Sequence, residues 1–201
     1  MLSLQKGQKL NLNKDMGGLK VAIVGLGWSP KRFQSQSDFD LDASCFVLKD
    51  DGSQFGAVVT NPAPENGWVC FYGQPKLPND VVVHSGDSRT GDAQGDDEQI
   101  KIDFTKMPPD ASRVAVIVTI HEGAERKQNF GQIDDAYAKI YDANGTQLAE
   151  YDLDESASTS VSMMFVEFKK NAAGEWTLQA IGEGFDKGLG DFFSAFKVPG
   201  Y

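Results

Sequence analysis

Short apolar or alternating runs, separated again and again by Gly, Pro, Asn and Asp, place the strongest constraint on how this chain folds. Ile100, Ile102 and Phe104 alternate with polar residues, a pattern that predicts a half-buried strand. Residues 113–120 are β-branched and almost wholly apolar, which predicts a central strand buried on both faces. Roughly ten to twelve such runs, with turns at short intervals, are typical of a β-sandwich or barrel.

Turn-forming residues bound each of the predicted strands. The strands cover residues 2–12, 19–26, 43–48, 54–60, 67–72, 81–84, 100–104, 113–120, 136–141, 147–151, 160–169 and 175–182. Hairpin turns are predicted at Asp50-Asp51-Gly52, at Asn144-Gly145 and at residues 171–174. Helical signal is weak: we expect a short helix within residues 186–196 and one turn within 123–132. No repeat or Pro-rich linker divides the chain. We therefore predict one domain over residues 1–201, mainly all-β, as a β-sandwich of two antiparallel or mixed sheets with a few short helices.

The formal net charge of −10 narrows the possible partners. Nucleic-acid binding depends on Lys and Arg that neutralise phosphates, so nucleic acid is not an expected partner. The same charge favours cations, although acidity also serves solubility. No apolar run is long enough for a membrane span, so direct membrane insertion is not expected.

The start of the chain is alternating and polar, without the apolar core of a signal segment, which predicts a cytoplasmic protein. Cysteines in that compartment are reduced. Cys45 and Cys70 both lie in apolar, strand-like stretches without Cys-x-x-Cys spacing. We therefore expect them to be small buried hydrophobic residues.

An acidic cluster precedes the predicted strand at 43–48. Asp38, Asp40 and Asp42 alternate with Phe39 and Leu41. In an extended segment the three carboxylates share one face and the two apolar side chains the other. Three aligned carboxylates without a basic residue between them repel one another, which indicates a cation between them.

A second acidic cluster over residues 86–98 joins two predicted strands and is rich in glycine. It differs from an EF-hand loop, which helices flank and which needs acidic or amide ligands at its third and fifth positions. Its glycines permit turns that direct backbone carbonyls inward. If the end of the loop is extended, Asp96 and Glu98 face one ion, while Asp97 faces another ion or a backbone donor.

Together the clusters predict a calcium site with two ions, because Ca²⁺ prefers 6–8 hard oxygen ligands at roughly 2.3–2.6 Å. The predicted ligands are Asp38, Asp40, Asp42, Asp87, Gly91 through its backbone, Asp96, Asp97 and Glu98. An acidic loop that is merely solvated remains the alternative.

Three catalytic interpretations have less support from the sequence than the calcium site. Residues 20–27 imitate the strand of a dinucleotide-binding fold that ends in Gly25-x-Gly27, but Pro30 replaces its third glycine and no crossover helix follows. His84 and His121 lack a Gly-x-Ser-x-Gly nucleophile elbow and are expected as polar residues at strand ends. A carboxylate pair for glycoside hydrolysis remains formally open. We expect no enzyme.

A calcium-dependent module that binds a sugar or a phosphate is the stronger alternative. Exposed aromatic side chains could line such a site, and the candidates are Trp28, Trp68, Phe71 and Tyr72. The same aromatic residues are equally compatible with a hydrophobic core.

The chain resembles the TerD family of tellurium-resistance and stress-response proteins. The resemblance covers most of the chain and depends chiefly on the two acidic motifs. The matching segments are residues 4–12, Val24-Gly25-Leu26-Gly27-Trp28, residues 38–44, residues 86–98, and Trp176 with Gly182, Gly184, Phe185, Gly188 and Leu189. Ser29, Ser88, Asp134 and Asp135 depart from the family pattern.

The resemblance implies a β-sandwich that binds Ca²⁺ between loops, in a cytoplasmic bacterial or phage-borne protein linked to tellurite resistance and general stress. It also implies action with other tellurium-resistance proteins in a membrane-associated complex, by binding or scaffolding rather than catalysis. The departures at Ser29 and Ser88 could alter one coordination position, and those at Asp134 and Asp135 bear on any partner surface.

Overall fold

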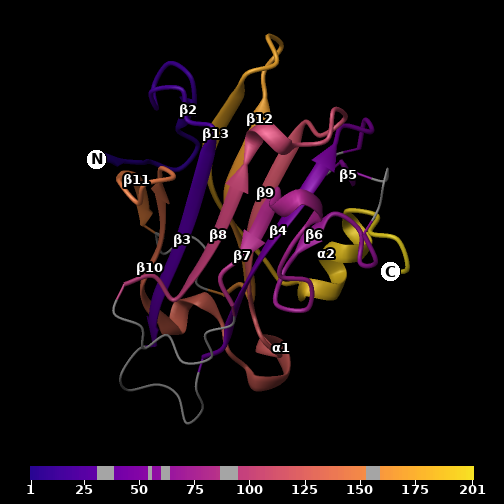
Figure 1. The fold of residues 1–201 in the computed structure, drawn as a ribbon. Coiled ribbons are helices and arrows are strands. Elements are labelled where there is room, and N and C mark those ends of the chain that lie inside the picture. Colours follow the sequence, from indigo (N-terminus) through magenta and orange to yellow (C-terminus); the bar gives the residue numbers. More distant parts are fainter. Residues whose placement is uncertain (31–38, 54–55, 60–63, 87–94, 153–158) are drawn as a thin grey trace.

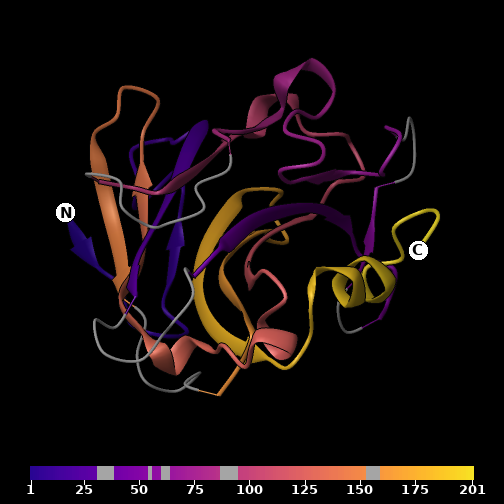
Figure 2. The same ribbon diagram turned by 90° about the horizontal axis from the view of Figure 1, so that it is seen from below.

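Two β-sheets face each other in the computed structural model, which describes residues 1–30, 39–53, 56–59, 64–86, 95–152 and 159–201 (Figures 1 and 2). The six-stranded sheet has the order β1-β11-β10-β3-β8-β7. Its strands are β1 (Leu2–Ser3), β3 (Val21–Pro30), β7 (Val82–His84), β8 (Glu98–Asp103), β10 (Ile133–Tyr141) and β11 (Gln147–Asp152).

The seven-stranded sheet has the order β2-β13-β12-β9-β4-β5, and β6 pairs with β4 beside this path. Its strands are β2 (Lys9–Asn11), β4 (Leu41–Lys49), β5 (Ala57–Val58), β6 (Val69–Cys70), β9 (Arg113–Ile120), β12 (Ser162–Lys170) and β13 (Trp176–Phe185). Pairing is antiparallel throughout both described sheets except between β1 and β11. The predicted all-β sandwich is confirmed.

The helices are short: α1 (Gly123–Arg126), α2 (Leu189–Ala195), and the 3₁₀ turns η1 (Pro78–Asp80), η2 (Phe104–Lys106) and η3 (Phe130–Gln132). Helix α2 covers the side of the seven-stranded sheet that faces away from the six-stranded sheet (Figure 2). Its Phe193 and the following Phe196 pack on Phe46 of β4, with ring centroids 5.9 and 4.7 Å away. Among the described residues, no helix has the length and apolar character needed to cross a bilayer.

Strand β9 confirms the central strand predicted from the apolar run. It lies between β12 and β4, and all of its residues after Arg113 are buried. Both sides of the strand are covered, one by the six-stranded sheet and the other in part by α2 (Figure 2). A strand in this position has no solvated face, which explains the absence of polar alternation in its sequence.

The predicted strand over residues 2–12 is wrong in one respect, because it is two strands in two sheets. β1 pairs with β11 of the six-stranded sheet, whereas β2 pairs with β13 of the seven-stranded sheet. The chain turns between them at Gly7, whose φ of 81° favours glycine. An alternating pattern continued across this turn and concealed it.

The predicted hairpins are present. β10 and β11 pair around Gly145, with a φ of 81°, and β12 pairs with β13. The Asp50-Asp51-Gly52 turn connects β4 to β5, and across it Leu48 lies opposite Val58. Residues 54, 55 and 60 of the predicted return strand lie outside the described residues.

Cys45 and Cys70 lie opposite each other on β4 and β6, and both are free and buried, as predicted. Burial raises the pKa of the Cys70 thiol to about 12. Burial, and next the neighbouring Cys70, raises the pKa of Cys45 well above its usual range. Both side chains therefore stay as thiols, the form that is neither a nucleophile nor a metal ligand.

The antiparallel pairing brings several strand ends to one end of the sandwich, which we call the acidic end. β3 and β9 finish there, and β4, β8 and β10 begin there (Figure 1). Leu26 of β3 is paired with Glu98 of β8, and Leu41 of β4 with Ile120 of β9. Both acidic clusters therefore adjoin this end.

Candidate metal centre

Glu98 connects the two sheets at the acidic end. Its side chain is buried, with 1% of the residue exposed, and its Oε2 accepts a hydrogen bond of 2.7 Å from the Ala43 N–H of β4. Since Glu98 belongs to one sheet and Ala43 to the other, this bond joins the two acidic clusters across 55 positions of sequence. A buried carboxylate needs such partners, because burial otherwise penalises its charge heavily.

His84 of β7 is the second partner of Glu98. Its Nε2 lies 3.3 Å from Glu98 Oε2, and its Nδ1 accepts the N–H of Gly86 at 3.0 Å. An Nδ1 that accepts a hydrogen bond carries no proton, so in the neutral ring the proton is on Nε2, which lies beside the carboxylate without making a hydrogen bond to it. His84 is a buried residue at a strand end, as expected, and it helps to hold Glu98 in place.

Asp96 lies on the opposite side of the six-stranded sheet from Glu98. Its Oδ1 accepts hydrogen bonds from the hydroxyls of Tyr137 and Tyr141, at 3.1 and 3.0 Å, and its Oδ2 accepts one from Gln99 at 2.9 Å. The expectation that Asp96 and Glu98 face one ion is therefore wrong. β8 begins only at Glu98, so the extended alternation does not reach back to Asp96.

The two tyrosines keep their protons. Burial first, and then the adjacent Asp96 carboxylate, raises the pKa of Tyr137 and of Tyr141 above the usual range. Each hydroxyl therefore remains a donor: that of Tyr141 faces Asp96, and that of Tyr137 is shared between Asp96 and the Gly95 carbonyl, 3.0 Å away. Neither tyrosine was predicted from the sequence, because their proximity to Asp96 depends on strand register rather than on local sequence.

Gly25 and Gly27 of β3 leave the space that this tyrosine–aspartate cluster occupies. A Cβ at Gly25 would lie 2.0 Å from Asp96 Oδ2, and one at Gly27 would lie 2.3 Å from Tyr137 Cζ. Real Cβ atoms do not approach other atoms so closely. The Gly-x-Gly pair thus serves side-chain packing across the sheet, and it was the one sequence signal that could have indicated the tyrosines.

Asp97 ties the same segment to the end of β3. Its Oδ2 accepts the Trp28 N–H at 2.9 Å, and its own N–H donates to the Leu26 carbonyl at 2.8 Å. This agrees with the expectation that Asp97 faces a backbone donor. The backbone of residues 96–98 is consequently held against β3 before β8 begins.

Asp40 and Asp42 adjoin the end of β9. The Asp40 carbonyl accepts the His121 N–H at 2.8 Å. Asp42 is 6% exposed, and its Oδ2 lies 3.6 Å from His121 Nδ1. Phe39 and Leu41 between them are buried, so this part of the predicted alternation is confirmed.

The predicted ligands are brought to one end of the molecule, but those that the structure describes do not converge on a point. Among the described residues, no three side chains of His, Cys, Asp or Glu lie close enough to hold a metal ion. Asp38, Asp87 and Gly91 lie outside the described residues. The donor chemistry, which consists of carboxylates and backbone carbonyls, suits Ca²⁺ rather than zinc.

The aromatic residues proposed for a sugar or phosphate site are mostly in the core. Trp28, Trp68 and Phe71 are buried, and only Tyr72 is exposed, at 48%. Of the two alternatives that the sequence left open for these residues, the structure supports the core for Trp28, Trp68 and Phe71.

Fold and site together define a class of protein: an all-β sandwich of two sheets, whose acidic end carries carboxylates fixed by backbone and tyrosine donors. A sequence model of the TerD domain matches residues 1–196. The chain belongs to the TerD domain family, as its motifs predicted.

Relatives support this assignment. A tellurium resistance protein TerD of Serratia marcescens is 36% identical over 198 residues, which cover 98% of this chain and 97% of the relative. General stress protein 16U of Bacillus subtilis is 38% identical over 189 residues, 94% of this chain and 93% of the relative. A solved homologue of telluride resistance protein TerD from Streptomyces coelicolor has the same fold, with a TM-score of 0.70 at 23% identity over 87% of this chain and 95% of its own.

Proposed function

We propose that the chain binds Ca²⁺ at the acidic end of the sandwich. The observation that carries the proposal is the hydrogen bond from the Ala43 N–H to Glu98 Oε2, which holds the two acidic clusters together. Asp40, Asp42, Asp96 and Asp97 would supply carboxylates from the described residues, and Asp38, Asp87 and the Gly91 backbone would complete the set. When bound, Ca²⁺ supplies positive charge that compensates carboxylates from distant segments.

In this proposal the role of Glu98 is to position the segments that carry the other ligands. Its Oε2 already accepts a backbone N–H, and His84 lies beside it, so its main contribution is to hold the start of β4 against the start of β8. The tyrosine hydroxyls fix Asp96 in the same way on the outer face. Pre-positioned ligands lose little conformational freedom when the ion binds, which favours affinity.

The biological role that we propose is stress response by binding or scaffolding rather than by catalysis. Its support comes from the relatives, whose names refer to tellurium resistance and general stress. The thiols of Cys45 and Cys70 are buried and protonated, which argues against their reducing or sequestering an oxyanion. A cytoplasmic location and a membrane-associated complex with other tellurium-resistance proteins remain part of the same proposal.

Calorimetric titration of the metal-stripped protein with Ca²⁺ tests the proposal. We expect about two ions per chain. The variant Asp40→Asn/Asp42→Asn should weaken at least one binding event by about tenfold or more, because each substitution removes an anionic oxygen ligand. Asp110→Asn, an exposed acid away from both clusters, is the matched control. No heat of Ca²⁺ binding, or equal affinity in all three proteins, would reject the calcium site.

A further inference from the structure

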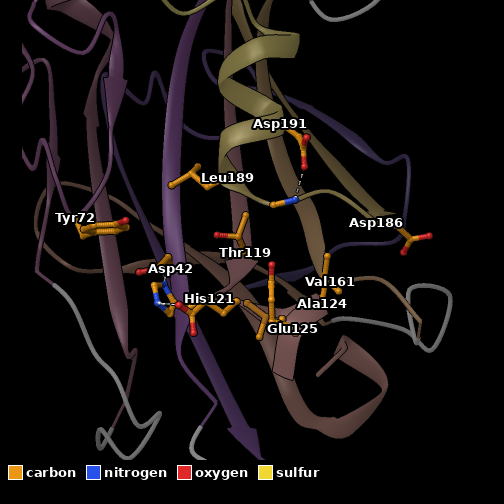
Figure 3. A pocket seen from close by; sticks show the side chains of 14 residues that line it. Asp42, Tyr72, Thr119, His121, Ala124, Glu125, Val161, Asp186, Leu189 and Asp191 are labelled. Carbon is orange, nitrogen blue, oxygen red and sulfur yellow. Dashed lines mark hydrogen bonds and ion pairs between the residues drawn. The ribbon is translucent and has the colours of Figure 1, made fainter. Parts of the chain in front are cut away.

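A cavity of about 280 Å³ lies next to the acidic end, on the outer side of the seven-stranded sheet (Figure 3). Its floor includes Thr119 near the end of β9, and its walls come from α1, the start of α2 and Tyr72. The volume is at the lower limit for small-molecule sites, which indicates a ligand of few atoms.

The lining of the cavity is strongly acidic. Five carboxylate side chains contribute to it, and they belong to Asp42, Glu122, Glu125, Asp186 and Asp191. No Lys or Arg is among the lining residues in the part of the chain that the structure describes. A cavity of one charge sign concentrates small ions of the opposite sign, and this one selects cations.

Thr119 supplies an independent indication of a ligand. The residue is 3% exposed, its side chain lines the cavity, and its hydroxyl has no hydrogen-bond partner within the described residues. Since its oxygen is not among the fully buried atoms that lack a partner, the hydroxyl is open to the cavity and can bond a ligand there. Leu189 and Val161 lie beside it and give the cavity an apolar wall (Figure 3).

The carboxylates surround the cavity instead of meeting at one point. Asp186 and Asp191 come from the connection between β13 and α2 and from α2 itself, whereas Glu122 and Glu125 come from the segment after β9 (Figure 3). Among the described residues, no three acidic or histidine side chains are close enough to hold a metal ion. Separated negative charges on two walls suit a cation with two charged ends better than a single ion.

Two of these acids have no other described task. Glu125 and Asp186 are exposed, and no hydrogen bond or ion pair of theirs occurs among the described residues. Asp191, by contrast, accepts the Gly188 N–H at 2.9 Å, and Glu122 pairs with Arg126 at 3.1 Å. Glu125 and Asp186, which come from different elements at the rim of the cavity, are therefore available for a ligand.

We propose that this cavity binds a short linear diamine, with one ammonium group toward each acidic wall. The alkyl spacer would lie on Leu189 and Val161, and the Thr119 hydroxyl would accept a hydrogen bond from an ammonium group. Charge-assisted hydrogen bonds of this type are about twice as strong as neutral ones. The proposal goes beyond calcium binding, and it shares with that site only Asp42.

Titration of the calcium-saturated protein with 1,4-diaminobutane, followed by NMR chemical shifts, tests the proposal. Because saturating calcium occupies the proposed metal site, the diamine cannot bind there and contribute to the measured shifts. We expect shifts confined to β9, α1 and the start of α2, and an affinity about tenfold or more above that of n-butylamine, which has the same chain but one charge. No saturable shift, or equal affinity for the two amines, would overturn it.

Paired variants separate the cavity from the general charge of the protein. Glu125→Gln/Asp186→Asn should weaken diamine binding by about tenfold or more. Glu65→Gln/Asp110→Asn also removes two exposed carboxylates, but away from the cavity, and should leave affinity unchanged. Equal weakening by both double variants would show attraction by net charge alone and would reject the site. All four residues are exposed, so both proteins are expected to fold.

Thr119→Val tests the floor of the cavity. The substitution keeps the shape of the side chain and removes its hydroxyl, so we expect weaker binding of 1,4-diaminobutane by about threefold to tenfold. Unchanged affinity in a folded Thr119→Val protein would remove Thr119 from the site. If this variant does not fold, the Glu125→Gln/Asp186→Asn comparison still decides the proposal.

Discussion

Glu98 and the cavity under α2 are both acidic, but the structure treats their carboxylates in opposite ways. Glu98 is buried, its Oε2 accepts the Ala43 N–H, and the His84 ring lies beside it. Glu125 and Asp186 are exposed and have no described partner. Carboxylates that protein groups already satisfy hold structure in place, whereas exposed carboxylates around a cavity are available to bind a ligand. One end of the molecule thus carries both a carboxylate that holds strands in place, that of Glu98, and carboxylates proposed to bind a ligand, those of Glu125 and Asp186.

The largest expected effect comes from Glu98→Ala. It leaves the buried Ala43 N–H without its acceptor and removes the carboxylate beside the His84 ring, so we expect a loss of about 3 kcal/mol in the free energy of unfolding. Urea denaturation measures it. Glu65→Ala, at an exposed position, should change stability by less than about 0.5 kcal/mol. A loss for Glu98→Ala as small as that of the control would remove its positioning role.

Calcium removal should have the next largest effect. A ligand that binds only the folded state at a hundred times its dissociation constant stabilises by about 2.7 kcal/mol. For a chain of this size, that corresponds to a Tm lower by about 5–10 °C after chelation with EGTA. Differential scanning calorimetry with and without Ca²⁺ measures the shift. An unchanged Tm would mean that the acidic end is held by protein contacts alone.

Gly27→Ala tests the packing that supports Asp96. The new Cβ would meet the Tyr137 ring, so the ring must move away from Asp96, at a cost of about 2 kcal/mol in unfolding free energy. Gly190→Ala is the matched control, because a Cβ at this position inside α2 would have no other atom within 4 Å. Alanine there should stabilise the helix by roughly 0.5–1 kcal/mol. The same sign for both variants would contradict the close approach at Gly27.

Tyr137→Phe should give the smallest effect, about 0.5–1 kcal/mol, because it removes one of several donors to Asp96. The sign of its pH dependence is more informative. The folded protein holds the tyrosine proton above the usual pKa of about 10, so the unfolded chain loses it first and stability falls as pH rises above that value.

Denaturation curves between neutral pH and alkaline pH measure this dependence. Tyr137→Phe should show a shallower loss of stability above pH of about 10 than the unmodified chain. Tyr201→Phe, at a position that is 62% exposed, should follow the unmodified chain. Identical alkaline curves for Tyr137→Phe and the unmodified chain would rule out a raised tyrosine pKa in the folded state.

The strands were predictable where the pattern is local. Seven of the eight residues of β9 are apolar or β-branched, which predicts a buried strand, and the Asn-Gly turn predicts the β10–β11 hairpin. The separation of β1 from β2 was not predictable, because the alternation continues across the turn at Gly7.

The site was predictable only in part. The sequence placed the two acidic clusters together, and the Glu98–Ala43 hydrogen bond does join them. It could not show that Asp96 faces outward, because that depends on where β8 begins. Nor could it show Tyr137 and Tyr141, whose position beside Asp96 depends on pairing between β10 and β3.

The division of the first residues between the two sheets has a consequence of its own. β1 shields the outer side of β11, and β2 shields the outer side of β13, so about a dozen residues cover one border of each sheet. Cutting the chain after this segment would expose two unprotected rows of backbone N–H and C=O groups at once. Such rows recruit strands from other molecules, so we expect proteolytic trimming at this terminus to promote self-association.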